Sequence, residues 1–430
     1  MLRLNSRDAG FDKAFRQLVN DRRESDADVS RVVGIILDDV RNRGDAALVD
    51  LTARYDGHTL SSDDDWCISA EACRDAFDDL LPDLRAALEL AAQRIRAYHE
   101  AQKPKNSDKT DDAGVRLGAR WNAVDAAGLY VPGGRAAYPS SLLMNAIPAK
   151  VAGVARLVVV TPSPKGQINP LVLAAAHLAG VDELWRIGGA QAIAALAYGT
   201  DRIKPVDVIT GPGNAWVAEA KRQLYGVVGI DMVAGPSEIL VIADGRNDPD
   251  WIAADLLSQA EHDPAAQSIL ITDDPVFADT VADRVGVELA MLPTARVAAE
   301  SWKAHGVIIE VASLDEAPAL ANALAAEHVE IATDKPEALF KHIRHAGSVF
   351  LGRHTPEAVG DYVAGPNHVL PTGRRARFAS GLSVLDFMKR TSFIQLDHAA
   401  LEKIGPAAIA LAEAEGLPAH ARSIELRLGI

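Results

Sequence analysis

AGLYVPGG (residues 127–134) is the first of four stretches with the same layout, followed by LVVVTPSP (157–164), LWRIGGAQ (184–191) and DVITGPGN (207–214). Each begins with a short apolar run typical of a buried strand and ends in a turn rich in glycine or proline. Apolar stretches after three of these turns predict helices at residues 142–155, 171–178 and 190–198. Strands that alternate with helices indicate βαβ units and a largely parallel sheet.

The same alternation resumes after Pro236. Further strand candidates lie at residues 238–243, 268–272, 306–311, 329–332 and 348–351. The sequence therefore predicts an α/β protein with two Rossmann-like α/β/α units and parallel-rich sheets, plus small helical N- and C-terminal extensions.

These patterns divide the chain into four parts. They are an N-terminal helical extension (1–25), an α/β domain formed by 26–127 and 238–383, a Rossmann-like domain (128–237) and a C-terminal segment (384–430). Residues 1 to about 112 have helical spacing, and Ser25 is predicted to begin one helix. We expect these N-terminal helices to pack on the second unit, because a start that is poor in strands needs a sheet to cover.

Composition limits the functional class. The chain has 430 residues, 44 of them basic and 59 acidic, so its net charge of −15 argues against a nucleic-acid or membrane-surface partner. Two cysteines, Cys67 and Cys73, are too few for a disulfide framework. The N-terminus has no apolar signal region, and no apolar stretch has the length of a membrane span, so we expect a soluble cytoplasmic protein.

The glycine-rich turns are candidates for binding a phosphate-containing ligand. Three of them, at residues 130–134, 188–191 and 211–214, follow strands and precede helices. Such turns line one edge of a doubly wound sheet, where glycine allows close backbone approach and helix N-termini attract anions. None matches GxGxxG, so a plain turn is the alternative for each. Together they favour a nucleotide-like ligand.

Gln259 and His262 are candidate metal ligands near the end of a predicted helix. Their spacing places both on one helical face, where an imidazole and a carbonyl oxygen can form half of a zinc site. Glutamine is an unusual zinc ligand, and chemistry alone favours the neighbouring Glu261. A histidine exposed at a helix end is the alternative.

Glu327 and His328 lie at a predicted helix-to-strand junction and are candidates for acid–base chemistry. Histidine is a natural base near neutral pH, and a neighbouring carboxylate can accept a proton from water. Adjacent residues of a strand point to opposite faces, so both side chains can serve one site only if the backbone turns there. An exposed loop pair is the alternative.

Two further segments combine glycine and proline with functional side chains. Residues 361–371 carry Asp361, Asn367 and His368, and residues 415–420 carry Glu415 and His420. Stiffened loops suit a ligand site, although an ordinary loop or helix end is the default interpretation. The sequence contains no GxSxG, P-loop, HExxH or paired CxxC motif, which argues against the commonest hydrolases, NTPases and zinc fingers.

Taken together, these segments resemble the histidinol dehydrogenase family. The matching stretches keep their order along the chain: GLYVPGGR (128–135), RIGGAQAIAALAYGT (186–200), GPGNAWVAEAKRQ (211–223), IDMVAGPSEILVIAD (230–244), DLLSQAEHD (255–263), GSVFLG (347–352), AGPNHVLPT (364–372), ARFASGLSVLDFMKRTSF (376–393) and EGLPAHARSIELR (415–427). One departure is Ala326, where the family usually has proline before the Glu-His pair.

The resemblance implies a set of roles at matching positions. It implies one zinc ion per subunit, held by Gln259, His262, Asp361 and His420, and an acid–base pair formed by Glu327 and His328. It implies NAD as the cofactor, contacted by Tyr130, Gln191 and Asn214. The implied contacts to L-histidinol are Ser237, Gln259, His262, His328, Asp361, His368, Glu415 and His420. Residues 128–237 would bind NAD, and the domain of 26–127 with 238–383 would carry most zinc and catalytic residues.

The implied reaction is the NAD-dependent four-electron oxidation of L-histidinol through L-histidinaldehyde to L-histidine, the last steps of histidine biosynthesis. His328 would take the hydroxyl proton and Glu327 would activate water. In the family the C-terminal segment crosses to the partner subunit, which implies a homodimer with shared active sites. The alternatives are a paralogous NAD-dependent dehydrogenase of another small alcohol on the same fold, a catalytically silent nucleotide-binding or scaffold protein, and a zinc hydrolase.

Overall fold

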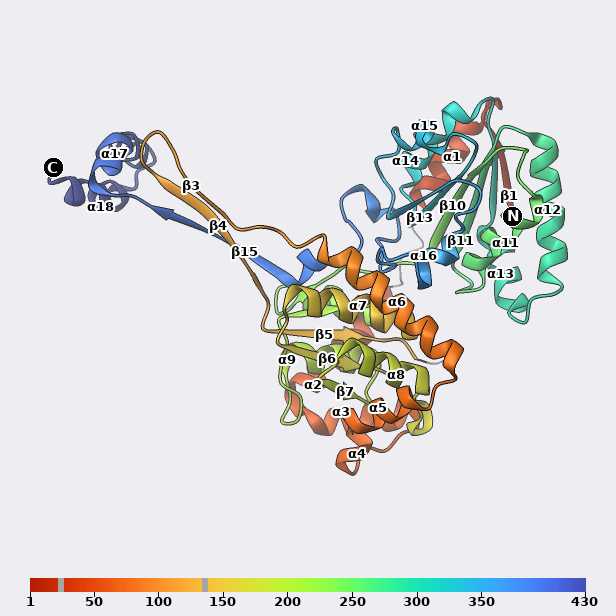
Figure 1. Cartoon of the computed structure of the whole chain (residues 1–430), viewed down its shortest axis with the longest axis horizontal. Helices are drawn as coiled ribbons and strands as arrows, with labels where there is room; N and C mark the ends of the chain where they lie inside the picture. The colour runs from red at the N-terminus through yellow and green to blue at the C-terminus, as the bar shows by residue number, and fades with distance from the viewer. Residues whose placement is uncertain (22–26, 134–137) are drawn as a thin grey trace.

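The computed structural model describes residues 1–21, 27–133 and 138–430, and Figure 1 shows two α/β units and an arm. Three features of the sequence analysis lie outside the described residues: the helix start predicted at Ser25, the predicted boundary between residues 25 and 26, and Gly134 of the first turn. Within the described part of the chain, no helix has the length and apolarity needed to cross a membrane.

The first unit contains a six-stranded sheet with the order β2-β7-β6-β5-β8-β9. Its strands are β2 (Cys67–Ile68), β5 (Ala126–Tyr130), β6 (Arg156–Val160), β7 (Glu183–Trp185), β8 (Val208–Thr210) and β9 (Gly229–Ile230). Neighbouring strands are parallel except for β2 and β7. The four strands predicted from the opening stretches are therefore confirmed as β5 to β8.

Helices cover both faces of this sheet, because successive strand residues point to opposite sides. Leu129 lies in one buried cluster and Tyr130 in the other. The first face is covered by α5 (Ala70–Asp78), α6 (Pro82–Glu100), α7 (Pro139–Ala152) and α8 (Pro170–Ala179). The second face is covered by α2 (Ala27–Arg43), α3 (Asp45–Asp56), α9 (Gly189–Tyr198) and α10 (Ala215–Leu224). The short helix α4 (Asp63–Trp66) precedes β2.

The second unit has the same three layers around an all-parallel sheet with the order β1-β12-β11-β10-β13-β14. Its strands are β1 (Leu2–Asn5), β10 (Glu238–Ala243), β11 (Gln267–Thr272), β12 (Val307–Glu310), β13 (His328–Ala332) and β14 (Ser348–Leu351). One face is covered by α1 (Phe11–Asn20), α14 (Ala317–Leu324) and α15 (Pro336–Phe340). The other is covered by α11 (Pro249–Ala260), α12 (Pro275–Leu289) and α13 (Ala295–His305), and α16 (Glu357–Tyr362) follows β14. Two Rossmann-like units are thus confirmed.

Two predictions for the N-terminal part are wrong. Residues 27–100 pack on the first unit rather than the second, since α2 contacts α9 and α10, α5 contacts α8, and α6 contacts α7. Residues 1–20 are not a purely helical extension, because β1 pairs with β12 at the edge of the second sheet. An amphipathic helix reveals its buried face but not which sheet it covers, and a four-residue edge strand has too short a pattern to recognise.

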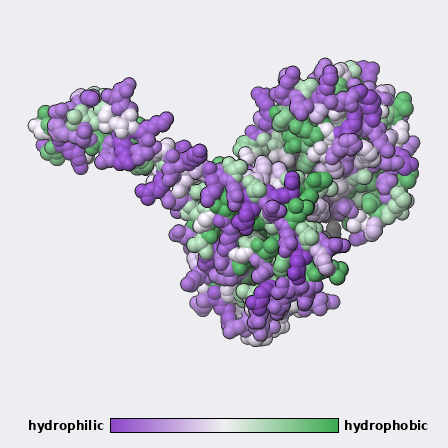
Figure 2. Space-filling model, in the orientation of Figure 1, coloured by the Kyte–Doolittle hydropathy of each residue, from purple (hydrophilic) through white to green (hydrophobic). Residues whose placement is uncertain are grey.

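The arm is an antiparallel sheet that extends from the first unit and ends in two helices (Figure 1). The sheet contains β3 (Ser107–Thr110), β4 (Arg116–Ala123) and β15 (Met388–Gln395), and the helices are α17 (His398–Ala414) and α18 (Pro418–Leu428). The C-terminal segment is therefore a strand followed by a helical pair, rather than helical alone. In Figure 2 this pair stands clear of the two units and carries both hydrophobic and hydrophilic surface.

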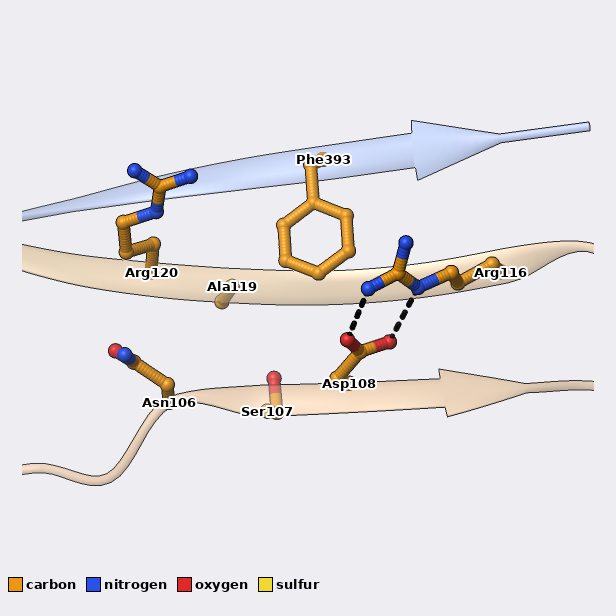
Figure 3. Close-up of a pocket in the computed structure, with 7 residues that line it drawn as sticks. All are labelled: Asn106, Ser107, Asp108, Arg116, Ala119, Arg120 and Phe393. Atoms are coloured by element: carbon orange, nitrogen blue, oxygen red, sulfur yellow. Dashed lines mark hydrogen bonds and ion pairs between the residues drawn. The ribbon is translucent and has the colours of Figure 1, made fainter.

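A hollow of about 320 Å³ lies on one face of the arm (Figure 3). Nε of Arg116 donates to Oδ1 of Asp108 at 2.8 Å, and the guanidinium lies 5.4 Å from the centre of the Phe393 ring. Gly118 makes this packing possible, because a Cβ there would overlap the Phe393 ring. The only acid lining the hollow is thus paired with Arg116, and these contacts stiffen the arm rather than form a reaction site.

Candidate active site

A cavity of about 120 Å³ lies where the two units meet. The first unit lines it with the Gly211–Gly213 turn and Asp231, and the second unit lines it with Ser237, Glu327 and His368. Sites for small molecules commonly span about 300–1,000 Å³, so this cavity is only part of such a site. The glycine-rich Gly211–Gly213 turn and the Glu327 side of the second unit nevertheless face one space.

The backbone turns at the Glu327–His328 junction, as their joint use of one site requires. Ala325 ends α14 in a left-handed conformation with φ of 47°, and β13 begins at His328. Both side chains then reach the same backbone unit: Oε2 of Glu327 accepts from the Glu238 amide at 3.0 Å, and Nδ1 of His328 lies 3.2 Å from the Glu238 carbonyl oxygen. The two side chains therefore converge on the backbone of Glu238 from adjacent positions.

The hydrogen bonds of His328 assign its tautomer. Nδ1 lies 3.0 Å from Oε1 of Gln259 as well as near the Glu238 carbonyl, and both neighbours are acceptors. In the neutral imidazole the proton must consequently be on Nδ1, which leaves Nε2 with its lone pair. Nε2 has no hydrogen-bond partner among the described residues, so it is free to accept a proton.

Burial moves the pKa values of the pair in opposite directions. It lowers the pKa of His328 to about 4, although the nearby Asp361 charge opposes this shift. Burial raises the pKa of Glu327 well above its usual value, and the charges of Glu238, Asp361 and Glu357 add to the increase. His328 is thus neutral near pH 7, whereas Glu327 retains its proton more readily than an exposed glutamate.

Two acids of α16 complete a cluster around His328. Oε1 of Glu357 lies 3.5 Å from Nε2 of His328, and Oδ1 of Asp361 lies 3.6 Å from Nδ1 of His368. Burial raises the pKa of Asp361, but its hydrogen bond to His368 and the charges of His368, His328 and His262 outweigh this effect and lower it overall. Burial and the Asp361 charge raise the pKa of Glu357 to about 8.

Gln259 and His262 occupy different environments. Gln259, on the last turn of α11, is 2% exposed, whereas His262 is exposed in the turn just beyond that helix. The His262 amide donates to the Gln259 carbonyl oxygen at 3.3 Å, which continues the helical path by one turn beyond α11. The His262 charge still affects the pKa of Asp361, which places this imidazole near the cluster.

These residues fit a divalent metal ion. Donor atoms of His328, Glu357 and Asp361 lie within 4.8 Å of one another, and Gln259 places a buried carbonyl oxygen beside His328. A set of imidazole, carboxylate and amide oxygen without sulfur suits Zn²⁺ and similar ions. Of this cluster, Asp361 and Gln259 belong to the predicted metal set.

Sequence reasoning missed Glu357. It lies one helical turn before Asp361, and this i, i+4 spacing on a polar segment was the available signal. Ser258 holds the Glu357 side chain, since its Oγ donates to Oε2 at 3.2 Å.

The predicted cofactor residues lie at the carboxyl edge of the first sheet. The Tyr130 hydroxyl, at the end of β5, accepts from the Gly189 amide at 3.2 Å, and burial raises the Tyr130 pKa to about 12. Gln191 is buried in the first turn of α9. Asn214 caps α10, because its Oδ1 accepts from the amides of Trp216 and Val217, which leaves its NH₂ group for a ligand.

Glu415 and His420 are not brought to this cluster within one chain. Glu415 ends α17 and His420 lies in α18, both exposed at the far end of the arm (Figure 1). The remaining predicted substrate residues, Ser237 and His368, line the cavity beside Glu327.

Comparisons with known proteins agree with one another. The family model described as histidinol dehydrogenase matches residues 19–428. A histidinol dehydrogenase from Zymomonas mobilis is 63% identical over 428 residues, covering 100% of this chain and 99% of the relative, and one from Ruegeria pomeroyi is 60% identical over 425 residues, covering 99% and 98%. The crystal structure of histidinol dehydrogenase from Elizabethkingia anophelis has a TM-score of 0.94 at 34% identity, covering 100% of this chain and 98% of that chain.

Proposed function

The chain belongs to the histidinol dehydrogenase family, and from this premise we propose that it oxidises L-histidinol through L-histidinaldehyde to L-histidine with NAD. The observation that carries the proposal is the buried His328, whose Nε2 has a free lone pair beside Glu357 and Asp361. An imidazole held neutral in this way is suited to take a proton from an alcohol.

The chain's own residues account for the proton transfers. His328 accepts the hydroxyl proton of the alcohol at Nε2 and that of the aldehyde hydrate in the second oxidation. The Gln259 and Glu238 oxygens stabilise the imidazolium that forms, because both accept from Nδ1. NAD, when bound, supplies a hydride acceptor for each of the two oxidations.

Glu327 is suited to activate the water that adds to the aldehyde. In its ionised form the raised pKa makes it a stronger base than an exposed carboxylate, and the Glu238 amide holds its Oε2. The cavity that it lines also contains His368 and the Gly211 turn, so the water would be activated between the substrate and cofactor sides. Retaining the aldehyde there protects it between the two oxidations.

Gln259, His262 and Asp361 would hold zinc, with His420 of a second copy as the fourth ligand. Zinc bound there would supply a Lewis acid that anchors the imidazole and amine of the substrate. Glu415 from the same second copy, together with Ser237 and His368, would contact the substrate.

The contribution of a second copy is supported by the arm. His420 and Glu415 are exposed on a helical pair that extends away from the two units (Figure 1). Leu411 and Leu426 on this pair are 65% and 62% exposed, which provides apolar surface for a homodimer interface. The small cavity in one chain agrees with a site that a second chain completes.

The proposed function is tested by counting NADH formed per molecule of L-histidinol in the presence of NAD and zinc. We expect two NADH per histidinol and L-histidine as the product. A ratio of one would indicate a simple alcohol dehydrogenase, and no NADH formation would reject the activity. Turnover of an ester or amide without NAD would instead support a zinc hydrolase.

A further inference from the structure

A fully buried ion pair lies beneath the glycine-rich turn that follows β8. The Lys221 ammonium contacts the Asp231 carboxylate, and each side chain is only 1% exposed. Lys221, on α10, also donates to the Gly211 carbonyl oxygen at 3.0 Å, and Oδ2 of Asp231 accepts from the Gly211 amide at 2.8 Å. The two charged groups therefore hold the Gly211 residue by both its amide and its carbonyl.

The backbone at Gly211 needs this support because its conformation is unusual. Its φ is 113°, and a Cβ at this position would overlap the Tyr130 carbonyl oxygen. The turn thus packs directly against Tyr130 at the end of β5. The hydroxyl of Tyr130 in turn accepts a hydrogen bond from the Gly189 amide. Any shift of Gly211 would change the spacing between two glycine-rich turns.

The same pair also connects α10 to the turn that precedes it. Lys221 lies seven residues after Asn214, two helical turns along the same face, and Asn214 caps the helix. The Asp231 carboxylate additionally accepts from the Met232 amide at 2.6 Å, which ties the segment after β9 to the turn. One ion pair therefore connects the turn, the capped helix and the chain that enters the second unit.

Stability alone does not explain why charges occupy this position. Desolvation opposes the pairing of buried charges, and apolar residues of similar volume are often as stabilising. What apolar residues could not provide is the donor and the acceptor that fix the Gly211 peptide groups. Gly211, Gly213 and Asp231 line the same cavity as Glu327, so the pair holds a part of the wall of the candidate site.

We propose that Lys221 and Asp231 are positioning residues that hold the Gly211 turn in the geometry that binds the NAD cofactor. This inference rests on the proposed function for the identity of the ligand. Neither side chain contacts the reacting atoms; each acts through the backbone of Gly211.

The test uses the double variant Lys221→Met/Asp231→Asn, which removes both charges and leaves similar volumes. We expect the Kd for NADH, measured by its fluorescence, and the KM for NAD to rise about tenfold, because the turn loses two charge-assisted hydrogen bonds. The KM for histidinol and the zinc content should remain unchanged, since the residues proposed to bind histidinol and zinc lie in the second unit and on the arm of a second copy. A purely structural role would alter all of these values or none.

The matched control is Arg156→Met/Glu183→Gln. This ion pair joins the amino ends of β6 and β7 at the opposite edge of the same sheet, with Arg156 Nε 2.7 Å from Glu183 Oε1. We expect the control to keep the wild-type Kd for NADH. A double variant at Lys221 and Asp231 that folds and binds NADH like the wild type would overturn the inference.

Two further measurements separate the possible failures. If the double variant does not fold, Asp231→Asn alone is measured, and an unchanged Kd for NADH would overturn the inference. A wild-type protein that binds NADH but does not oxidise histidinol would reject the proposed substrate, while the NADH titrations would still test the role of the pair.

Discussion

The two α/β units share one layer arrangement but face the cavity with opposite edges of their sheets. In the first unit, Tyr130 ends β5 and Gly211 follows β8, so the carboxyl ends of the strands and the N-termini of α9 and α10 lie at the site. In the second unit, His328 begins β13 and Gln259 lies in the last turn of α11, so the amino ends of the strands and a helix C-terminus lie there.

This difference explains why the two edges suit different ligands. Helix N-termini carry partial positive charge and favour anions such as the phosphates of a dinucleotide. Helix C-termini carry partial negative charge and favour cations, and the second unit adds Glu327, Glu357 and Asp361. The same fold thus provides a backbone-built edge that suits an anion and an acidic edge that suits a cation.

Replacing the base of the acidic edge should have the largest effect. We expect His328→Ala to lower kcat about 100- to 10,000-fold, because general-base catalysis contributes that much. The initial rate of NADH formation measures the loss, and His342→Ala, an exposed histidine, serves as the control. An unchanged kcat in His328→Ala would contradict the assignment of His328 as the general base.

Removing an acid of the acidic edge should weaken the proposed metal site. We expect Asp361→Ala to lower zinc retention and activity about 10- to 100-fold, since even partners of metal ligands have effects of that size. Metal analysis after dialysis measures retention, and the control is Asp334→Ala, whose carboxylate pairs with Arg353 on the surface. Full zinc retention in Asp361→Ala would contradict its role as a ligand.

Burial of acids behind the acidic edge should also make the free energy of unfolding depend on pH. Asp255 hydrogen-bonds to Glu330 behind the cluster, and burial raises its pKa to about 6. An acid whose pKa is higher in the folded state stabilises the protein below the unfolded pKa of about 4, and this stabilisation is lost as pH rises through 6.

Asp255→Asn should remove that dependence. The free energy of unfolding of the variant, relative to wild type, should increase on the order of 2 kcal/mol between pH 4 and pH 7, measured by urea denaturation. Asp283→Asn, an exposed acid on α12, should show no such trend. A difference that stays constant with pH would show that Asp255 ionises normally in the folded protein.

The smallest effect is expected at the anion edge, where the Tyr130 side chain acts only through a single backbone amide. Tyr130→Phe leaves the Gly189 amide without its acceptor, so we expect the KM for NAD to rise about two- to tenfold, the value of one hydrogen bond. The KM for histidinol should not change, and Tyr198→Phe, near the other end of α9, is the control. A larger rise in the KM for histidinol than in the KM for NAD would contradict the assignment of the two ligands to different edges.

The layered core could be predicted from the sequence, because buried parallel strands are short apolar runs and their turns contain glycine and proline. The requirement that the backbone turn at the Glu327–His328 junction was also foreseen, and the chain bends at Glu327, directly before β13 begins at His328. The sequence could not show that the two units face the cavity with opposite edges of their sheets, since the linear order of elements does not show how two units dock.

Other features depend on contacts between distant segments. The Lys221–Asp231 pair joins a helix to a later strand end, and only the fold shows that both surround Gly211. The arm strands β3 and β4 are largely exposed and lack an apolar alternation, so their sequence carries no strand pattern that could be recognised. The pairing of Glu357 with His328 likewise requires α16 to run back along the second sheet.

A catalytic site assembled from two chains is tested most directly by mixing two inactive variants, His328→Ala and His420→Ala, and refolding them together. Half of the dimers formed are mixed, and each mixed dimer has one intact site of two, so we predict recovery of about a quarter of wild-type activity. A mixture that remains as inactive as either variant alone would contradict the proposal that His420 acts in the site of a second chain.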